Sequence, residues 1–266
     1  MAETGRLTVP AVRPSRLWVR PVTAVRIVII VAIVVVWEAV SRSGLLYRDV
    51  VPSLIAIGQA LYLTLRDGSF YFHLGTTAYE IGIAMIIGGL SGLAVGILLG
   101  GSKFLSRAYE SLLYYLGPCP KIIFFPIMIM WFGVGPGSKV AMGAISCFFP
   151  VALNVAGGMR EIDKVLIRVG RSFRANTWQM VTKIYLPAMR HPVINGVRLG
   201  LGVALIGTLL AETKLSNRGI GFLVIQAYSI FNMPQMYALL IILFVVAIGA
   251  NTVIGRLGGL DAIKRS

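Results

Sequence analysis

The chain has 266 residues, of which 57% are hydrophobic and only 13% are charged, and its formal net charge is +15 at pH 7. Soluble domains average about 25% charged residues, and several apolar runs here exceed the roughly 18–20 residues that cross a bilayer. The composition therefore excludes an ordinary soluble domain. The positive charge does not indicate nucleic-acid binding, because the basic residues cluster in short segments beside apolar runs, where they orient a membrane protein.

The N-terminal part is predicted to comprise a tail, an anchor and a short helix. Residues 1–21 are rich in arginine and proline and are expected to form a cytoplasmic tail. The apolar run Ile27–Val40 lacks a clear cleavage site after it, which favours an uncleaved first span over a signal peptide. Pro52-Ser53 then opens an amphipathic helix that Asp67-Gly68 ends.

The second predicted span, Leu74–Gly100, carries four glycines spaced by four residues. A stripe of small residues lets another helix approach closely in a membrane. We expect this stripe to serve packing within the chain, and a seam between two copies is the alternative. The stripe consists of Gly88, Gly92, Gly96 and Gly100.

The third predicted span, Tyr109–Gly133, is expected to be broken at Gly117-Pro118-Cys119-Pro120 and again at Pro126, because proline lacks the N–H and clashes with the preceding turn. Irregular backbone at membrane depth is tolerated where it is buried in protein or lines a wet cavity. Lys121 follows the break, and a lysine inside a span often faces a cavity or an acidic partner, or extends its amine to the interface. A translocation wall is thus predicted, with a kink that serves only packing as the alternative. The candidate path residues are Pro118, Pro120, Lys121, Met128, Trp131 and, further along, Glu212.

The segment Gly133–Lys139 superficially resembles a phosphate-binding loop. It departs from that pattern because Ser138 precedes Lys139 and because it lies between two spans. We therefore expect a tight turn leading into the fourth span, Val140–Gly158. The two cysteines and two histidines of the chain have no metal-ligand spacing, so no metal site is expected.

The polar interval from Arg160 to Pro187 separates the fourth span from the fifth, Val193–Ala211. A loop of this length between membrane helices needs a reason to exist. Helical spacing predicts one short helix ending near Phe173, and Thr177 is expected to cap a second one that Pro187 ends. This arrangement is typical of a docking knob for a partner.

The remaining chain completes six predicted spans with both termini on one side. Glu212 lies near the outer end of the fifth span, where structural pairing is the alternative to a solute contact, and Met236–Ile254 is the last span. Most of the 25 lysines and arginines then share the side of the loop, which by the positive-inside rule is the cytoplasm. The expected organisation is a permease domain at 22–258 between cytoplasmic tails at 1–21 and 259–266.

The polar interval resembles a known signature. Ile184-Tyr185-Leu186-Pro187 matches the I-x-L-P end of the cytoplasmic "EAA" loop of ABC importer permeases, and Gly170-Arg171-Ser172-Phe173 is most similar to the nitrate/sulfonate/taurine/bicarbonate branch. Counting back places the family's Glu-Ala-Ala on 168–170 and its glycine on Arg174. A left-handed corner at Arg174 would cost about 1–2 kcal/mol, so the alternatives are a turn shifted toward Asn176 or an unusual ATPase contact. The candidate coupling residues are Arg168, Val169, Gly170, Arg171, Ser172, Phe173, Arg174, Ala175 and Asn176.

The resemblance implies an all-α, six-span type I (MetI-like) ABC importer permease in a bacterial inner membrane. Its implied partners are two ATPase subunits, a second permease copy (identical or a paralogue) and a periplasmic or lipid-anchored solute-binding protein. The chain shows no Walker A loop, so we expect no enzymatic activity and no cofactor of its own, with ATP and Mg²⁺ held by the ATPase. The implied solute is small and anionic. The alternative functions are an ATP-independent secondary transporter or channel, which would favour an inverted repeat, and a membrane scaffold.

Overall fold

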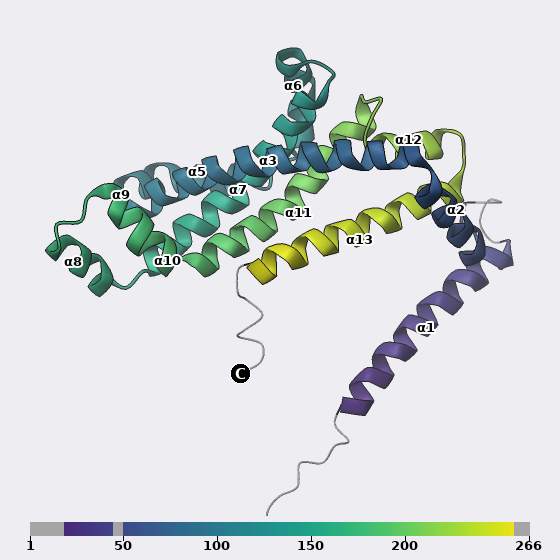
Figure 1. The fold of residues 1–266 in the computed structure, drawn as a ribbon, viewed down its shortest axis with the longest axis horizontal. Helices are drawn as coiled ribbons and strands as arrows, with labels where there is room; N and C mark the ends of the chain where they lie inside the picture. The colour runs from purple at the N-terminus through teal and green to yellow at the C-terminus, as the bar shows by residue number, and fades with distance from the viewer. Residues whose placement is uncertain (1–18, 45–49, 258–266) are drawn as a thin grey trace, which may run out of the picture. The chain divides into compact units, whose positions relative to one another are not determined.

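The computed structural model describes residues 19–44 and 50–257, with side chains from Thr23 onward, and every regular element in these ranges is helical (Figure 1). The all-α prediction is confirmed. The long helices are α1 (Val19–Ser43), α3 (Gly68–Gly101), α7 (Pro136–Glu161), α11 (Arg190–Lys214) and α13 (Met233–Leu257). The shorter elements are α2 (Leu54–Arg66), α4 (Lys103–Leu105), η1 (Ser106–Glu110), α5 (Ser111–Leu116), η2 (Lys121–Phe124), α6 (Phe125–Phe132), α8 (Lys164–Ser172), α9 (Thr177–Met180), η3 (Val181–Tyr185), α10 (Leu186–Ala188) and α12 (Ile220–Ser229).

Five of these helices are long and apolar enough to cross a membrane. A sixth span arises if the pair Lys103–Leu116 and Lys121–Phe132, bent by 91°, counts as one. The predicted tail at 1–21 overlaps the start of α1, and the rest of it lies outside the described residues, as does the predicted tail at 259–266.

The chain divides into two compact units, the first of which ends at Ala56. In this unit the last turns of α1 bind the segment that leads into α2. The Trp37 indole donates to the Pro52 carbonyl at 3.1 Å, and Glu38 accepts from the Leu54 amide at 3.2 Å. Ser53 accepts from the Ala56 amide at 3.3 Å, so it caps α2 as the sequence predicts.

The second unit begins at Ile57 and contains the remaining spans. Asp67 is the N-cap of its longest helix, α3, and accepts from the Ser69 amide at 2.9 Å and the Ser69 hydroxyl at 2.6 Å. These hydrogen bonds lower the pKa of the Asp67 carboxyl because they stabilise its charged form. Asp67 is therefore the single residue that separates α2 from α3.

A bundle of α3, α7 and α11 forms the centre of this unit, and α13 packs on α11 (Figure 1). The glycine stripe of α3 is the seam with α7. A Cβ on Gly92 would lie 2.8 Å from the Phe148 carbonyl oxygen, and one on Gly96 would lie 2.6 Å from the Val155 Cβ. Side chains there would force the helices apart, so the prediction of packing within the chain is confirmed.

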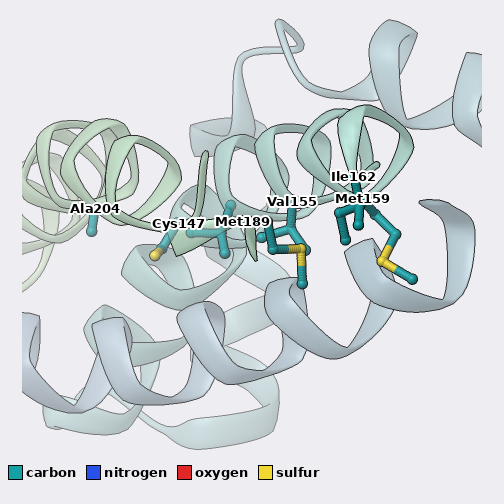
Figure 2. Packing of buried hydrophobic residues seen from close by; sticks show 7 residues of the cluster. Cys147, Val155, Met159, Ile162, Met189 and Ala204 are labelled. Atoms are coloured by element: carbon teal, nitrogen blue, oxygen red, sulfur yellow. The ribbon is translucent and has the colours of Figure 1, made fainter. Parts of the chain in front are cut away.

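The main apolar core runs along α7 and reaches both ends of the polar interval. Figure 2 shows Cys147, Val155 and Met159 of α7 with Ala204 of α11. Ile162, at the start of the interval, and Met189, just after its end, belong to the same cluster and are 7% and 1% exposed. The interval is therefore anchored in the bundle at both ends.

Candidate coupling elbow and translocation path

The polar interval folds as two helices joined by a sharp corner, as predicted. The first helix, α8, is capped by Asp163, whose side chain accepts from the Val165 amide at 2.8 Å. The second comprises α9, η3 and α10. We call residues 163–188 the elbow.

Two predicted boundaries of the second helix are wrong by one residue. Its cap is Asn176 and not Thr177: Asn176 has extended backbone and accepts from the Gln179 amide at 2.8 Å, while Gln179 accepts from the Asn176 amide at 2.9 Å. This capping box leaves Thr177 as the first helical residue. Pro187 does not itself end the helix, because Ala188 is still helical and the chain leaves the helical conformation only at Met189, whose φ is −107° and ψ is 25°.

The corner lies at Arg174, the position of the family's glycine, with φ at +51°. The Ala175 amide donates to the Gly170 carbonyl at 3.1 Å and the Arg174 amide to the Arg171 carbonyl at 2.9 Å. This pair of bonds defines a Schellman motif with its left-handed residue at Arg174. Because Asn176 has φ of −73°, the alternative of a turn shifted toward Asn176 is excluded.

Gly170 lets the two helices of the elbow close on each other. It is buried, and a Cβ there would lie 2.7 Å from the Met180 sulfur and collide with the Ile184 side chain. The small residue at this position is therefore required by the packing of α8 on the second helix.

The tip of the elbow presents large apolar side chains to solvent. Phe173 is 83% exposed, Trp178 74% and Val169 46%. Arg168, Arg171 and Arg174 surround them, and none of these arginines forms an ion pair with a described residue. Of the other predicted coupling residues, Ser172 donates to the Arg168 carbonyl at 3.1 Å and Ala175 is half-buried beside the corner. Exposed aromatic residues ringed by unpaired cations are typical of a docking surface.

The predicted break in the third span is confirmed, with residues 117–120 separating α5 from η2 and α6. Lys121 donates to the Gly117 carbonyl and, at 3.4 Å, to the Cys119 carbonyl, and its amine lies 4.9 Å from the centre of the Phe149 ring. The lysine thus satisfies carbonyls that the break leaves free. Pro126 does not interrupt a second time, because it lies in the first turn of α6.

The predicted path residues do not all lie on one open surface. Pro118 and Pro120 are exposed, Lys121 is half-buried, and Trp131 is 71% exposed. Met128 is 7% exposed and packs in a core cluster with Phe125, Met142 and Ala211. Glu212 is fully buried. Within this chain, Met128 and Glu212 therefore contact packed neighbours and not an open wall.

Glu212 joins a buried polar network that the sequence analysis missed. Its carboxylate accepts from the Thr77 hydroxyl at 2.7 Å and the Gly221 amide at 2.6 Å, and Thr77 accepts from the Ile220 amide at 2.8 Å. The buried Glu80 lies one turn beyond Thr77 and contacts Glu212. The network ties the start of α12 to α3 and α11. An acidic residue inside the apolar run of α3 was the available signal, since such groups are costly in a membrane and need partners.

His73 and Lys139 complete this region. The His73 Nδ1 accepts from the Gly219 amide at 3.1 Å, so this histidine is a partly buried structural partner of α12. Lys139 is 1% exposed and donates to the carbonyls of Val134 and, at 3.1 Å, Gly135. The segment before α7 is therefore a tight turn, as predicted, and Lys139 in the first turns of α7 binds its carbonyls.

These features define a class of protein: a multi-span helical subunit with one sharply bent helix pair and an elbow between two spans that exposes aromatic side chains. Comparison with known proteins gives the family. The model of the binding-protein-dependent transport system inner membrane component matches residues 88–260, and the chain belongs to this family. It is a permease component of an ABC importer of the sulfonate/taurine/nitrate group, and is not itself catalytic.

Several relatives show the same relationship. The chain is 30% identical over 214 residues to a putative aliphatic sulfonates transport permease of Bacillus subtilis, covering 80% of this chain and 78% of the relative. It is 30% identical to a taurine transport system permease of Escherichia coli, covering 60% and 58% of the two chains. It is 24% identical to a nitrate import permease of Synechococcus elongatus, covering 73% and 72%. Binding-protein-dependent transport implies an ATPase and a solute-binding protein as partners.

Proposed function

We propose that this chain forms one half of the translocation path of an ATP-driven importer, with both termini in the cytoplasm and one ATPase subunit docked on its elbow. The observation that carries the proposal is the elbow itself. Its tip exposes Phe173 and Trp178 among arginines that form no ion pair with the described part of the chain, while its base lies in the bundle core through Ile162 and Met189. A tip that can bind a partner through exposed aromatic residues, on a base packed into the bundle, suits transmission of force from the ATPase to the membrane helices.

In this mechanism, Phe173 inserts into an apolar groove of the ATPase, and Arg168 and Arg171 face acidic residues there. ATP and Mg²⁺ bind to the pair of ATPase subunits and close it, which draws the two elbows of a permease dimer together. The bundle then changes from an inward-open to an outward-open state. ATP binding drives this change only to the extent that the ATPase contacts the two states differently.

We further propose that the exposed part of the break, Pro118 to Lys121, and Trp131 face the solute path, with the second permease copy forming the opposite wall. This copy is either an identical chain or a paralogue. The names of the relatives support small solutes that include sulfonates, taurine and nitrate. A separate solute-binding protein delivers the solute from outside.

The test is Phe173→Ala, read as the amount of ATPase that co-purifies with the permease. Truncating a buried interface aromatic costs about 2 kcal/mol or more, so we expect the affinity to fall at least about 30-fold. Phe104→Ala is the matched control, because Phe104 is 77% exposed on another polar turn. Equal ATPase recovery and equal ATP-dependent uptake in Phe173→Ala and the wild type would refute the docking role.

A further inference from the structure

A cavity of about 630 Å³ lies between α5, α7 and α11, on the side of the bundle where the elbow begins. Asn154 and Glu161 of α7 line it together with His191 and Asn195 of α11 and Tyr114 of α5. Glu161 is the last residue of α7, and Arg190 begins α11. The cavity is therefore bounded by the same two helices that hold the elbow, so any movement of the elbow reshapes it.

The helical register of α7 explains how the cavity is formed. Asn154, Gly157 and Glu161 are spaced by three and four residues, so they share one face over two turns, a length of about 10.5 Å. A Cβ added to Gly157 would meet nothing within 4 Å, whereas one added to Gly158 would meet the Pro192 side chain. Gly158 thus brings α7 and α11 together, and Gly157 keeps the cavity open.

The lining of the cavity does not carry the positive charge that would bind a bare anion. Among the described residues that line the cavity, Glu161 is the only acidic one and none is a lysine or arginine, while His191 contributes an imidazole. The neighbouring Arg160 is paired with Glu110 and donates to the Ser106 hydroxyl at 3.3 Å. Asn154 donates to the Pro150 carbonyl at 2.8 Å, which leaves its second amide hydrogen and its oxygen for a ligand.

We propose that this cavity is a binding site on the solute's way to the cytoplasm, and that it accepts small solutes bearing an ammonium or another N–H donor in preference to bare anions. The proposal rests on the proposed transport function and names the solute class. Glu161 receives the ammonium group, and the amides of Asn154 and Asn195 bind the polar or acidic end of a zwitterion. A monoanion without a donor gains only the amide contacts and is repelled by the carboxylate.

The charge of the cavity is tested with a single cysteine, Asn195→Cys, in the full-length permease with Cys119→Ser and Cys147→Ala. The probes are two methanethiosulfonates of similar size, one with a trimethylammonium group and one with a sulfonate. By Coulomb's law the Glu161 carboxylate attracts the cationic reagent and repels the anionic one, so we expect a several-fold preference for the cationic reagent. We expect Glu161→Gln to abolish this preference. An equal or faster reaction with the sulfonate reagent would overturn the proposal.

Binding is tested by protection of the same cysteine. Taurine is the zwitterionic probe, and ethanesulfonate is the matched anion without an ammonium group. We expect taurine to slow the modification more than ethanesulfonate does, and Glu161→Gln to remove the difference. Equal protection by both, or protection by neither, would refute selective binding.

Access is tested with Gly157→Leu, which places a side chain at a lining position where an added Cβ meets nothing within 4 Å. We expect the modification of Asn195→Cys to slow at least tenfold, an effect of about 1.4 kcal/mol. Gly202→Leu is the control on α11, because a Cβ there also meets nothing within 4 Å. Equal slowing by both variants, or by neither, would exclude a shared cavity. These measurements need no ATPase, so their failure leaves the docking role of the elbow standing.

Discussion

The left-handed residue at the tip of the elbow gives the sharpest prediction. Arg174 has φ of +51° at the C′ position of a Schellman motif, where glycine is preferred. A non-glycine residue in this conformation costs about 1–2 kcal/mol, and glycine instead costs about 0.5–1 kcal/mol in unfolded-chain entropy. We therefore expect Arg174→Gly to stabilise the corner by about 0.5 kcal/mol.

The matched control is Arg171→Gly, which removes another exposed arginine from the last turn of α8, a right-handed helix. Glycine in a helix costs about 0.8–1.0 kcal/mol, so this variant should destabilise the same corner. The two variants change the net charge identically. The difference between them, about 1.4 kcal/mol, therefore reports the backbone conformation at Arg174.

The assay is hydrogen exchange of the Ala175 amide, which is bonded to the Gly170 carbonyl at 3.1 Å. We expect its protection to rise about twofold in Arg174→Gly and to fall about fivefold in Arg171→Gly, since 1.4 kcal/mol corresponds to a factor of ten. Lower protection in Arg174→Gly than in the wild type would show that the corner is not strained at this residue.

Arg174→Gly also distinguishes backbone strain at the corner from a contact between Arg174 and the ATPase. Hydrogen bonds to charged groups contribute about 1.5–3 kcal/mol. If the Arg174 guanidinium binds the ATPase, Arg174→Gly should lower the affinity at least about tenfold while it stabilises the elbow. An unchanged affinity with a stabilised elbow would assign Arg174 no role in docking.

Three further predictions concern the bundle and its orientation. Gly96→Val should cost about 1–3 kcal/mol through overpacking of the seam with α7, and thermal unfolding should show no such loss for Gly89→Val, whose Cβ meets nothing within 4 Å. Glu212→Leu should leave the Gly221 amide of α12 without its acceptor and cost about 1–3 kcal/mol, seen as faster hydrogen exchange of α12, and unchanged exchange would show that Glu212 does not tie α12 to the bundle. A cysteine at Asn176, in the elbow, should stay unmodified by an impermeant reagent added outside intact cells. A cysteine at Asn217, between α11 and α12, should react. The reverse pattern would show that the proposed orientation in the membrane is wrong.

Local and periodic signals explain what the sequence predicted well. The break at 117–120 follows from two prolines around one residue, which no regular helix accommodates. The glycine seam follows from a spacing of four, and the elbow from apolar residues at helical spacing within a basic interval. Each of these signals lies within a single element, so it can be recognised from the sequence without knowledge of the tertiary structure.

The features that the sequence did not predict have two physical causes: local patterns compatible with two structures, and contacts between helices far apart in the chain. Asn176 and Thr177 are both good caps, and only the glutamine three residues after Asn176, which completes a capping box, distinguishes them. Pro126 is compatible with either an interruption or a first turn, and the backbone of the preceding residues decides between them. The contact between Glu80 and Glu212 joins two helices far apart in the chain, so no local pattern predicts it.

The structure links the elbow mechanically to the interrupted span. At the base of the elbow, Arg160 is paired with Glu110 and donates to the Ser106 hydroxyl at 3.3 Å, while Ser106 donates to Glu110 at 2.5 Å. This ion pair connects the last turn of α7 to η1, which continues through α5 into the break. Separating the two side chains would leave the Glu110 carboxylate, whose side chain is 9% exposed, without its partner, which disfavours separate movement of α7 and α5. A pull on the elbow therefore moves α7 and α5 together, and the bend of 91° after α5 is the nearest place where the strain can be relieved. Under the proposed mechanism, this connectivity favours gating at the break over flexing of the elbow.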